Sequence, residues 1–149
     1  MTLVNINYKG EIVKGFETLE FPNMVPCQVV MKTVDKSTLI VFKSGKCRLM
    51  GCKQPITSTN VSIGGVKMHI NSIQSATVVL NMKRQYRLDV LSTKIKMIYE
   101  PELFPAARLV EYNPLCVNLF ASGKVVITGL KSLDFQNEIM TIYYRLINL

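Results

Sequence analysis

Phe120-Ala-Ser-Gly-Lys-Val-Val-Ile-Thr-Gly-Leu-Lys131 is the stretch that decides the fold, because it occurs twice in the chain. The earlier copy is Phe42-Lys-Ser-Gly-Lys-Cys-Arg-Leu-Met-Gly-Cys-Lys53; the copies start 78 residues apart and share six of twelve residues. Each has the pattern of a β-hairpin: a strand ends at the Phe, Ser-Gly turns the chain, and a second strand follows. The repetition predicts two similar halves, residues 1–73 and 74–149, within one compact domain.

The composition is that of a folded protein with a basic surface. Of the 149 residues 48% are hydrophobic, enough for a sizeable core. No apolar run is long enough to cross a membrane, and the first residues resemble a strand and not a signal peptide, so we expect an intracellular protein. The net charge of +8 favours a negatively charged partner, with nucleic acid first and anionic membranes or acidic proteins next. Charge alone leaves open a solvated basic surface with no specific partner.

The chain lacks the residue sets on which catalysis and metal binding depend. It has one histidine, His69, and its four cysteines form no Cys-x-x-Cys pair. A structural zinc site is therefore not expected, and the thiols should be reduced and mostly buried. The sequence also has no paired carboxylates at a plausible site and no phosphate-cradling Gly-rich loop. We predict that the protein is not an enzyme and has no cofactor.

The remaining segments predict an α+β fold. Strands are expected over residues 2–8, 28–34, 38–42, 76–82, 106–111, 115–121 and 124–129. Helices are expected over residues 10–20, 56–73, 87–98 and 132–148, the last with Ser132 as N-cap. Two such halves could join into one antiparallel sheet with its helices on a single face. The open face would then be polar or bind a partner.

The resemblance to a known family rests on two segments. Tyr99-Glu-Pro-Glu-Leu-Phe-Pro105, followed by the copy at residues 120–131, closely resembles the second repeat of the TATA-box-binding protein family. Residues 25–53 resemble the first repeat more weakly. The chain is similar to a shortened, divergent member without the variable N-terminal region, of a kind that a large DNA virus could encode. The resemblance implies a saddle: two pseudo-symmetric repeats form one curved antiparallel sheet whose concave face binds the DNA minor groove, with helices on the convex face.

Members of this family insert apolar side chains as wedges between base steps, and they are the established example of this way of binding the minor groove. In the second half Phe104 and Phe120 match both wedge positions. In the first half Phe42 matches one and the smaller Val25 the other, so we expect a shallower kink there. The alternative for the phenylalanines is a place in the core.

The groove-reading positions differ between the halves. Thr128 matches a family threonine, but its counterpart is Met50, which donates no hydrogen bond. Arg48 stands where the second half has Val126, and strand alternation places it on the face of Met50. We expect Arg48 to enter the groove or contact a flanking phosphate; the alternative is an arginine in solvent at a sheet edge.

Two further sets follow from the resemblance. The family's asparagine positions correspond to Ser75 and, as the nearest candidate in the first half, Asn5. These departures argue against a strict TATA preference. The phosphate-contacting positions, with solvated lysines as the alternative, correspond to Lys46, Lys53, Lys124 and Lys131.

The loop Glu100, Pro101, Glu102 and Leu103 matches the segment that docks transcription factor IIB in this family, with ordinary turn chemistry as the alternative. The predicted function is a transcription initiation factor that binds and bends A·T-rich double-stranded DNA through the minor groove. It would act as a monomer on DNA and recruit a factor IIB-like protein and the RNA polymerase machinery, in the nucleus or at a site of viral transcription. Two alternatives stay open: an interaction scaffold of a preinitiation complex with little intrinsic DNA specificity, and an accessory domain of a nucleic-acid enzyme.

Overall fold

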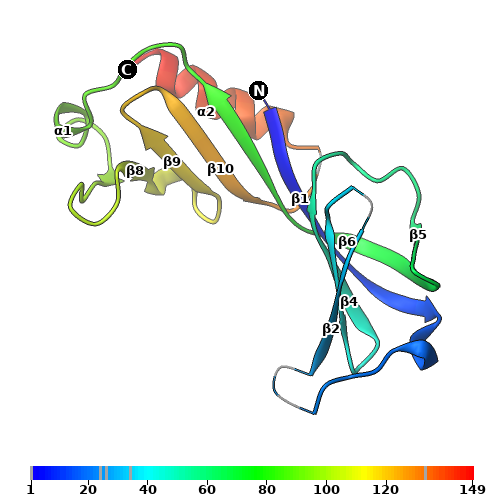
Figure 1. Ribbon diagram of the computed structural model, residues 1–149. Helices are drawn as coiled ribbons and strands as arrows, with labels where there is room; N and C mark the ends of the chain where they lie inside the picture. The colour runs from blue at the N-terminus through cyan, green and yellow to red at the C-terminus, as the bar shows by residue number, and fades with distance from the viewer. Residues whose placement is uncertain (1, 24, 26, 34, 133) are drawn as a thin grey trace. The chain divides into compact units, whose positions relative to one another are not determined.

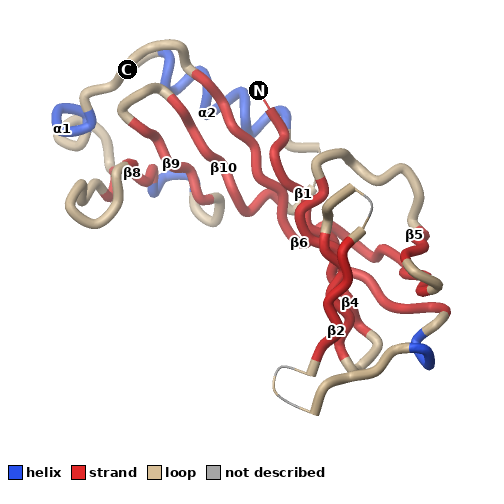
Figure 2. Tube along the Cα trace, in the orientation of Figure 1, coloured by secondary structure: helices blue, strands red, loops and turns tan. Residues whose placement is uncertain are grey.

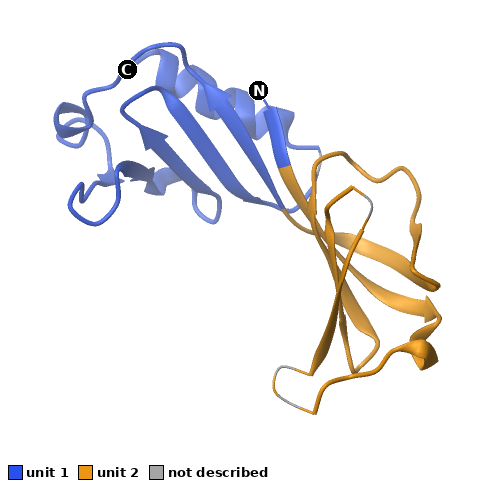
Figure 3. Ribbon diagram, viewed as in Figure 1, with its two compact units in different colours: residues 1–4, 76–149 blue, residues 5–75 orange. Residues whose placement is uncertain are grey.

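The computed structural model describes residues 2–23, 25, 27–33, 35–132 and 134–149. The chain forms two compact units, coloured blue and orange in Figure 3: unit 1 comprises residues 1–4 and 76–149, and unit 2 comprises residues 5–75. Strands are the commonest secondary structure in both units (Figure 2). Two long strands, β1 (Thr2–Lys14) and β6 (Val66–Asn81), contribute residues to both.

Unit 1 is an antiparallel sheet with one helix on one face (Figure 1). Starting from β6, the strand order continues with β10, β9, β8 and β7. These strands span Lys124–Leu130, Cys116–Phe120, Ala106–Leu109 and Met97–Ile98. The helix is α2 (Gln136–Ile147), and the short turns α1 (Leu88–Leu91) and η2 (Val110–Tyr112) lie in the connections.

The core of unit 1 comes from strict alternation along its central strands. The inward residues of β9 and β10 are fully buried: Val117, Leu119, Val125 and Ile127. Helix α2 buries Ile139, Ile142 and Leu146, whose spacing is that of one helical face. Each such side chain contributes about 1.5–3 kcal/mol relative to exposure. This pattern leaves the outward residues of the same strands on the opposite face.

The amphipathic C-terminal helix is confirmed, but not its predicted N-cap. Helix α2 begins at Gln136, and its N-cap residue Phe135 makes no side-chain cap bond. Ser132 lies further upstream, where its Oγ accepts a hydrogen bond from the Asp134 backbone N at 3.0 Å. The serine therefore shapes the connection before the helix and not the helix terminus itself.

Unit 2 is built from strands in the order β2, β3, β4 and β1. Strands β2, β3 and β4 span Gln28–Lys32, Thr38–Phe42 and Lys46–Cys52, and β5 (Asn60–Ile63) pairs with β6. The buried residues again alternate, and they include Ile6, Leu39, Val41, Leu49, Val66 and Met68. In the described part of this unit the single helical element is the 3-10 turn η1 (Phe16–Thr18).

The two copies of the repeated stretch form the hairpins β3–β4 and β9–β10, as predicted. Gly45 and Gly123 occupy the same turn position with φ of 89° and 91°. Their backbone N–H groups donate to Phe42 O at 2.9 Å and Phe120 O at 3.0 Å. A left-handed φ at this position explains why both copies carry glycine.

Two predicted helices in the first half are wrong. Residues 10–14 continue strand β1, and only η1 remains of the helix expected over residues 10–20. A Cβ at Gly10 would lie 2.2 Å from the His69 carbonyl oxygen, so β6 passes close beneath β1 there. The helix expected over residues 56–73 is the hairpin β5–β6. Its turn is Gly64-Gly65 with φ of 54° and 80°, which overrides the helical spacing of the apolar residues.

The helix expected over residues 87–98 is also mostly wrong, because only the four residues of α1 are α-helical. The hydroxyls of Ser92 and Thr93 donate to the carbonyl oxygens of Asp89 at 2.9 Å and Val90 at 2.6 Å. Such local side-chain bonds compete with continuation of a helix. The chain then turns and enters the short strand β7.

Candidate nucleic-acid interface

The face of the unit 1 sheet opposite α2 is open in the part of the chain that the structure describes. Strand register aligns four residues across it in one row, namely Val79, Val126, Asn118 and Arg108. Thr128 lies on the same face, directly opposite Cys116. The sequence singled out Val126 and Thr128; their neighbours were missed because cross-strand pairing is invisible without the register.

Phe104 and Phe120 come together at one end of this face. Their ring centroids lie 6.1 Å apart in an edge-to-face arrangement with an interplanar angle of 66°. Phe120 is the last residue of β9 and lies opposite Ala106, the first residue of β8. Phe104 lies two residues before β8 and is 49% exposed. Edge-to-face packing fixes the two rings relative to one another. The result is a rigid apolar projection of two aromatic rings.

The loop at residues 100–103 precedes this projection. The Leu103 and Phe104 backbone N–H groups both donate to Glu100 O, at 2.9 and 3.0 Å. Leu103 is 80% exposed, and Glu100, Pro101 and Glu102 are exposed beside it. The turn therefore displays an exposed apolar side chain directly after two exposed glutamates.

The open face of unit 2 carries its charges at different positions. Arg48 is exposed, and its guanidinium lies 5.7 Å from the centroid of the partly exposed Phe42 ring. Arg48 pairs with Ile40 on one side and with Lys9 on the other. Met50 pairs with Thr38 and is partly exposed. Arg48 and Met50 therefore share this face, as strand alternation predicted.

The asparagine positions contain a residue that the sequence reasoning missed. Asn7 donates from Nδ2 to Ser75 Oγ at 3.3 Å, and its Oδ1 accepts from the Gly51 backbone N at 3.0 Å. Asn5 lies two residues earlier on the same strand face, and its buried Oδ1 has no hydrogen-bond partner among the described residues. Period-2 alternation at Asn5 and Asn7 was the signal available in the sequence.

The four predicted phosphate-contacting lysines are all exposed: Lys46, Lys53, Lys124 and Lys131. The two units differ in their surroundings. Lys46 lies opposite Glu11, whereas Lys124 lies opposite the neutral Asn81. The Glu11 carboxylate therefore weakens the positive electrostatic potential at Lys46 relative to that at Lys124, although the two lysines match in sequence.

Val25 is 96% exposed and three residues before Gln28, the residue that pairs with Phe42. Phe104, by contrast, is two residues before Ala106, the partner of Phe120. The neighbouring Pro26 lies outside the described residues. The wedge role of Val25 thus stays a prediction.

The cysteines divide into two classes. Cys47 and Cys52 are buried, whereas Cys27 and Cys116 are partly exposed. Burial, with a smaller contribution from Glu11, raises the pKa of the Cys47 thiol to about 12. Burial also raises the pKa of Cys52. Thiolate chemistry is therefore suppressed at both buried positions.

Neither metal binding nor membrane spanning finds support in the described residues. They contain no group of three His, Cys, Asp or Glu side chains that could hold a metal ion. In the same part of the chain, every helix is too short or too polar to cross a bilayer.

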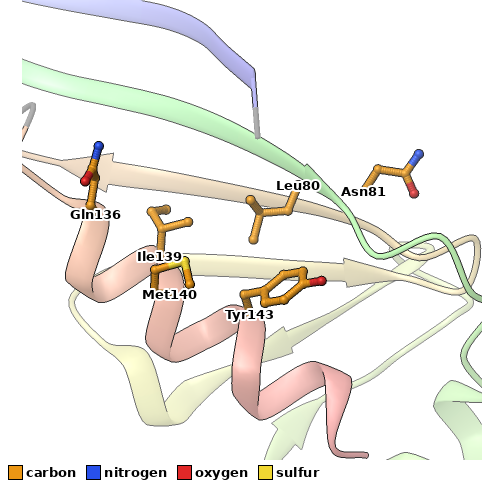
Figure 4. Close-up of a pocket in the computed structure, with 6 residues that line it drawn as sticks. All are labelled: Leu80, Asn81, Gln136, Ile139, Met140 and Tyr143. Atoms are coloured by element: carbon orange, nitrogen blue, oxygen red, sulfur yellow. The ribbon is translucent and has the colours of Figure 1, made fainter.

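A pocket of about 380 Å³ lies beside α2, on the side of the sheet away from the open face. In Figure 4, Ile139 and Tyr143 project from α2 and Leu80 from β6. Its lining is mainly apolar, with Asn81 and Gln136 as the polar contributors. The pocket therefore belongs to the packing between helix and sheet and is separate from the candidate interface.

Comparison with known proteins agrees with this geometry. The family described as "Transcription factor TFIID (or TATA-binding protein, TBP)" matches residues 71–149. A TATA-box-binding protein of Methanococcus maripaludis is 31% identical over 147 residues, which cover 89% of this chain and 79% of the relative. One from Tetrahymena thermophila is 33% identical over 135 residues, or 80% of this chain and 55% of the relative.

The solved structure of Methanococcus jannaschii TBP is similar to this chain with a TM-score of 0.72 and 26% sequence identity. The similarity covers 99% of this chain and 98% of that one. It confirms the predicted α+β fold class with its antiparallel sheet. The chain therefore belongs to the TATA-binding protein family, whose members are DNA-binding transcription factors and, as the sequence predicted, not enzymes.

Proposed function

We propose that this protein binds A·T-rich promoter DNA through the minor groove and bends it, with Phe104 and Phe120 as the wedge. The observation that carries the proposal is the edge-to-face pair of rings at the end of the open face of unit 1. A wedge must be apolar, flat and rigid, because separating a base step costs a few kcal/mol. The half-exposed Phe104 ring, held against Phe120, meets these conditions.

The rest of the unit 1 face supports groove binding. The minor groove of A·T pairs presents acceptors and lacks the guanine amino group. Val79 and Val126 offer an apolar surface of low relief, and Thr128 and Asn118 can donate hydrogen bonds from its middle. Such a face fits the floor of an A·T-rich groove better than that of a G·C-rich one.

Exposed lysines and the net charge of +8 support contacts with the DNA backbone. We assign Lys46, Lys53, Lys124 and Lys131 to phosphates, a role that adds affinity without sequence information. The protein would act on DNA as a monomer, because both of its repeats would contact the duplex. It would do so in the nucleus or at a site of viral transcription.

The loop at residues 100–103 is proposed to bind a factor IIB-like protein. Glu100 and Glu102 repel phosphate, so the loop is unsuited to DNA, while exposed Leu103 offers an apolar anchor. A basic partner surface complements this loop, and through that partner the RNA polymerase machinery would be recruited. Replacing Leu103 by Ala should abolish the supershift with factor IIB and leave DNA binding intact; an unchanged supershift would contradict this assignment.

The wedge is tested by end-to-end fluorescence transfer on a doubly labelled A·T-rich duplex. Wild-type protein should raise the transfer efficiency, and Phe104→Ala and Phe120→Ala should each lower the bend at saturating protein. Tyr144→Ala is the matched control, since Tyr144 is an exposed aromatic residue on α2. A bend that survives both phenylalanine changes would refute the wedge assignment. Failure of folded wild-type protein to bind duplex at low salt would refute the function.

A second candidate function is a protein scaffold within the preinitiation complex, with weak intrinsic DNA affinity. The observation that favours it is the altered open face of unit 2, where Arg48 and Met50 take the places of Val126 and Thr128. Capture of factor IIB that survives nuclease treatment, together with no shift of duplex DNA, is the result expected for the scaffold.

A further inference from the structure

Two cations lie directly opposite one another on the open face of unit 2. Lys9 of β1 and Arg48 of β4 form one register pair, and both side chains are exposed. Opposed residues of neighbouring antiparallel strands have Cβ atoms about 4.5–5.5 Å apart, and like charges at that spacing repel. The strand pairing therefore holds two positive charges closer together than the isolated chain would place them.

The internal repeat shows what this pair replaces. Arg48 lies 78 residues before Val126, the spacing between the two copies of the repeated hairpin. Val126 pairs with Val79 of β6 just as Arg48 pairs with Lys9 of β1. Unit 2 thus carries a dication where unit 1 carries two valines, so the two open faces cannot make the same contact.

The positive charge of this pair is compensated only in part, by one carboxylate of the same surface. The nearby carboxylate, Glu11, lies opposite Lys46 and not opposite Lys9 or Arg48. In the described part of the chain, the two ion pairs join Arg87 to Asp89 and Arg145 to Glu111, away from this pair.

The pair also lines a hollow. Its volume is about 610 Å³. Three cations and one carboxylate line it together with an aromatic ring and neutral polar groups: Lys9, Lys46, Arg48, Glu11, Phe42, Ser44 and Asn71. The Phe42 ring lies 5.7 Å from the Arg48 guanidinium and restricts its position. Ser44 and Asn71 add neutral hydrogen-bond donors. Cations with neutral donors around a concave surface are the chemistry that binds a phosphate group.

We propose that this hollow binds a phosphodiester of the DNA backbone, with Lys9 and Arg48 as its two cationic ligands. Unit 2 then holds the backbone, whereas unit 1 reads the minor groove. The inference rests on the proposed function, because it assumes that duplex DNA is the ligand. It also assigns a role to Lys9. Comparison of the two repeats does not suggest this role, because the residue that corresponds to Lys9 in unit 1 is Val79.

The test is the salt dependence of duplex binding by Lys9→Val/Arg48→Val, which gives unit 2 the valine pair of unit 1. Each phosphate neutralised contributes about 0.9 to the slope of log K against log salt. Between 50 and 200 mM salt, the affinity of wild type for duplex DNA should therefore fall by about 3- to 12-fold more than the affinity of the variant, if the variant has lost one or two phosphate contacts. The control Lys14→Val/Lys67→Val removes the same charge from exposed unit 2 positions outside the hollow.

A second measurement uses wild-type protein and duplexes with single uncharged methylphosphonate linkages. At least one position should weaken wild-type binding severalfold and leave the Lys9→Val/Arg48→Val variant unaffected. If the valine variant does not fold, Lys9→Gln/Arg48→Gln takes its place. A slope equal to that of the control variant, or methylphosphonate effects identical in both proteins, overturns the phosphate assignment. Absence of wild-type duplex binding overturns instead the proposed function on which it rests.

Discussion

The turn glycines of the repeated hairpins offer an internally controlled test of the structure. Gly45 and Gly123 have nearly the same φ, 89° and 91°, in equivalent turns. Their surroundings differ. No described atom lies within 4 Å of a Cβ built on Gly45, but a Cβ on Gly123 would lie 2.1 Å from the Arg84 carbonyl oxygen. We predict that Gly123→Ala is substantially more destabilising than Gly45→Ala.

The magnitude follows from two contributions. A left-handed φ costs an alanine about 1–2 kcal/mol, and this contribution is common to both variants. Relieving a steric overlap in a packed region costs a further ~1–3 kcal/mol, and this contribution arises only at Gly123. Gly45→Ala should therefore lower the free energy of unfolding by about 1–2 kcal/mol and Gly123→Ala by about 2–5 kcal/mol.

The overlap at Gly123 is costly because Arg84 is anchored through its side chain. The Arg84 guanidinium donates to Ile147 O at 3.3 Å and Leu149 O at 2.9 Å, and it lies 4.7 Å from the centroid of the Tyr86 ring. Displacing the Arg84 carbonyl thus disturbs the contacts that hold the C-terminal end of α2.

Urea unfolding followed by far-ultraviolet circular dichroism measures both changes, since the chain has no tryptophan. Each variant is compared with wild type by the change in its free energy of unfolding. Asparagine tolerates a left-handed φ, so Gly45→Asn should be nearly neutral while Gly123→Asn remains destabilising. Equal losses for the two alanine variants, within about 0.5 kcal/mol, would contradict the close approach of Arg84 to the turn.

Three further predictions concern single side chains. Duplex DNA should protect Cys116, which lies on the open face of unit 1, from alkylation; equal rates with and without DNA would place the binding surface elsewhere. Tyr86→Phe removes a hydrogen bond from the phenol to Leu146 O at 2.9 Å and should cost about 1 kcal/mol in urea unfolding, whereas an unchanged midpoint would show that this bond contributes nothing. Hydrogen bonds from neighbouring hydroxyls hold the pKa of Asp35 below its usual 3.8, so the carboxylate stabilises the fold above that pH and loses this effect as the pH falls through the lowered value. In Asp35→Asn, the free energy of unfolding should lack this part of its dependence on pH. If it falls with pH as in wild type, the hydrogen bonds to Asp35 have no effect on stability.

The candidate site could be predicted in part from the sequence. Phe104 and Phe120 were identified by their motif, and the structure brings their rings together. Arg48 and Met50 were placed on one face by alternation, which is a local property of a strand. Lys9, Asn7 and the row at Asn118 were missed, because each depends on which strand pairs with which and in what register.

The sequence by itself determined the paired hairpins, their turn glycines and the amphipathic face of α2. These features arise from interactions among near neighbours, so a few residues carry the whole signal. Only the tertiary structure decided that residues 56–73 form a hairpin and that residues 10–14 extend β1. It also decided the opposition of Lys9 to Arg48, where the repeat has two valines. The physical reason is that sheet pairing joins residues far apart in the chain, and burial on the sheet outweighs the local helical preference of those segments.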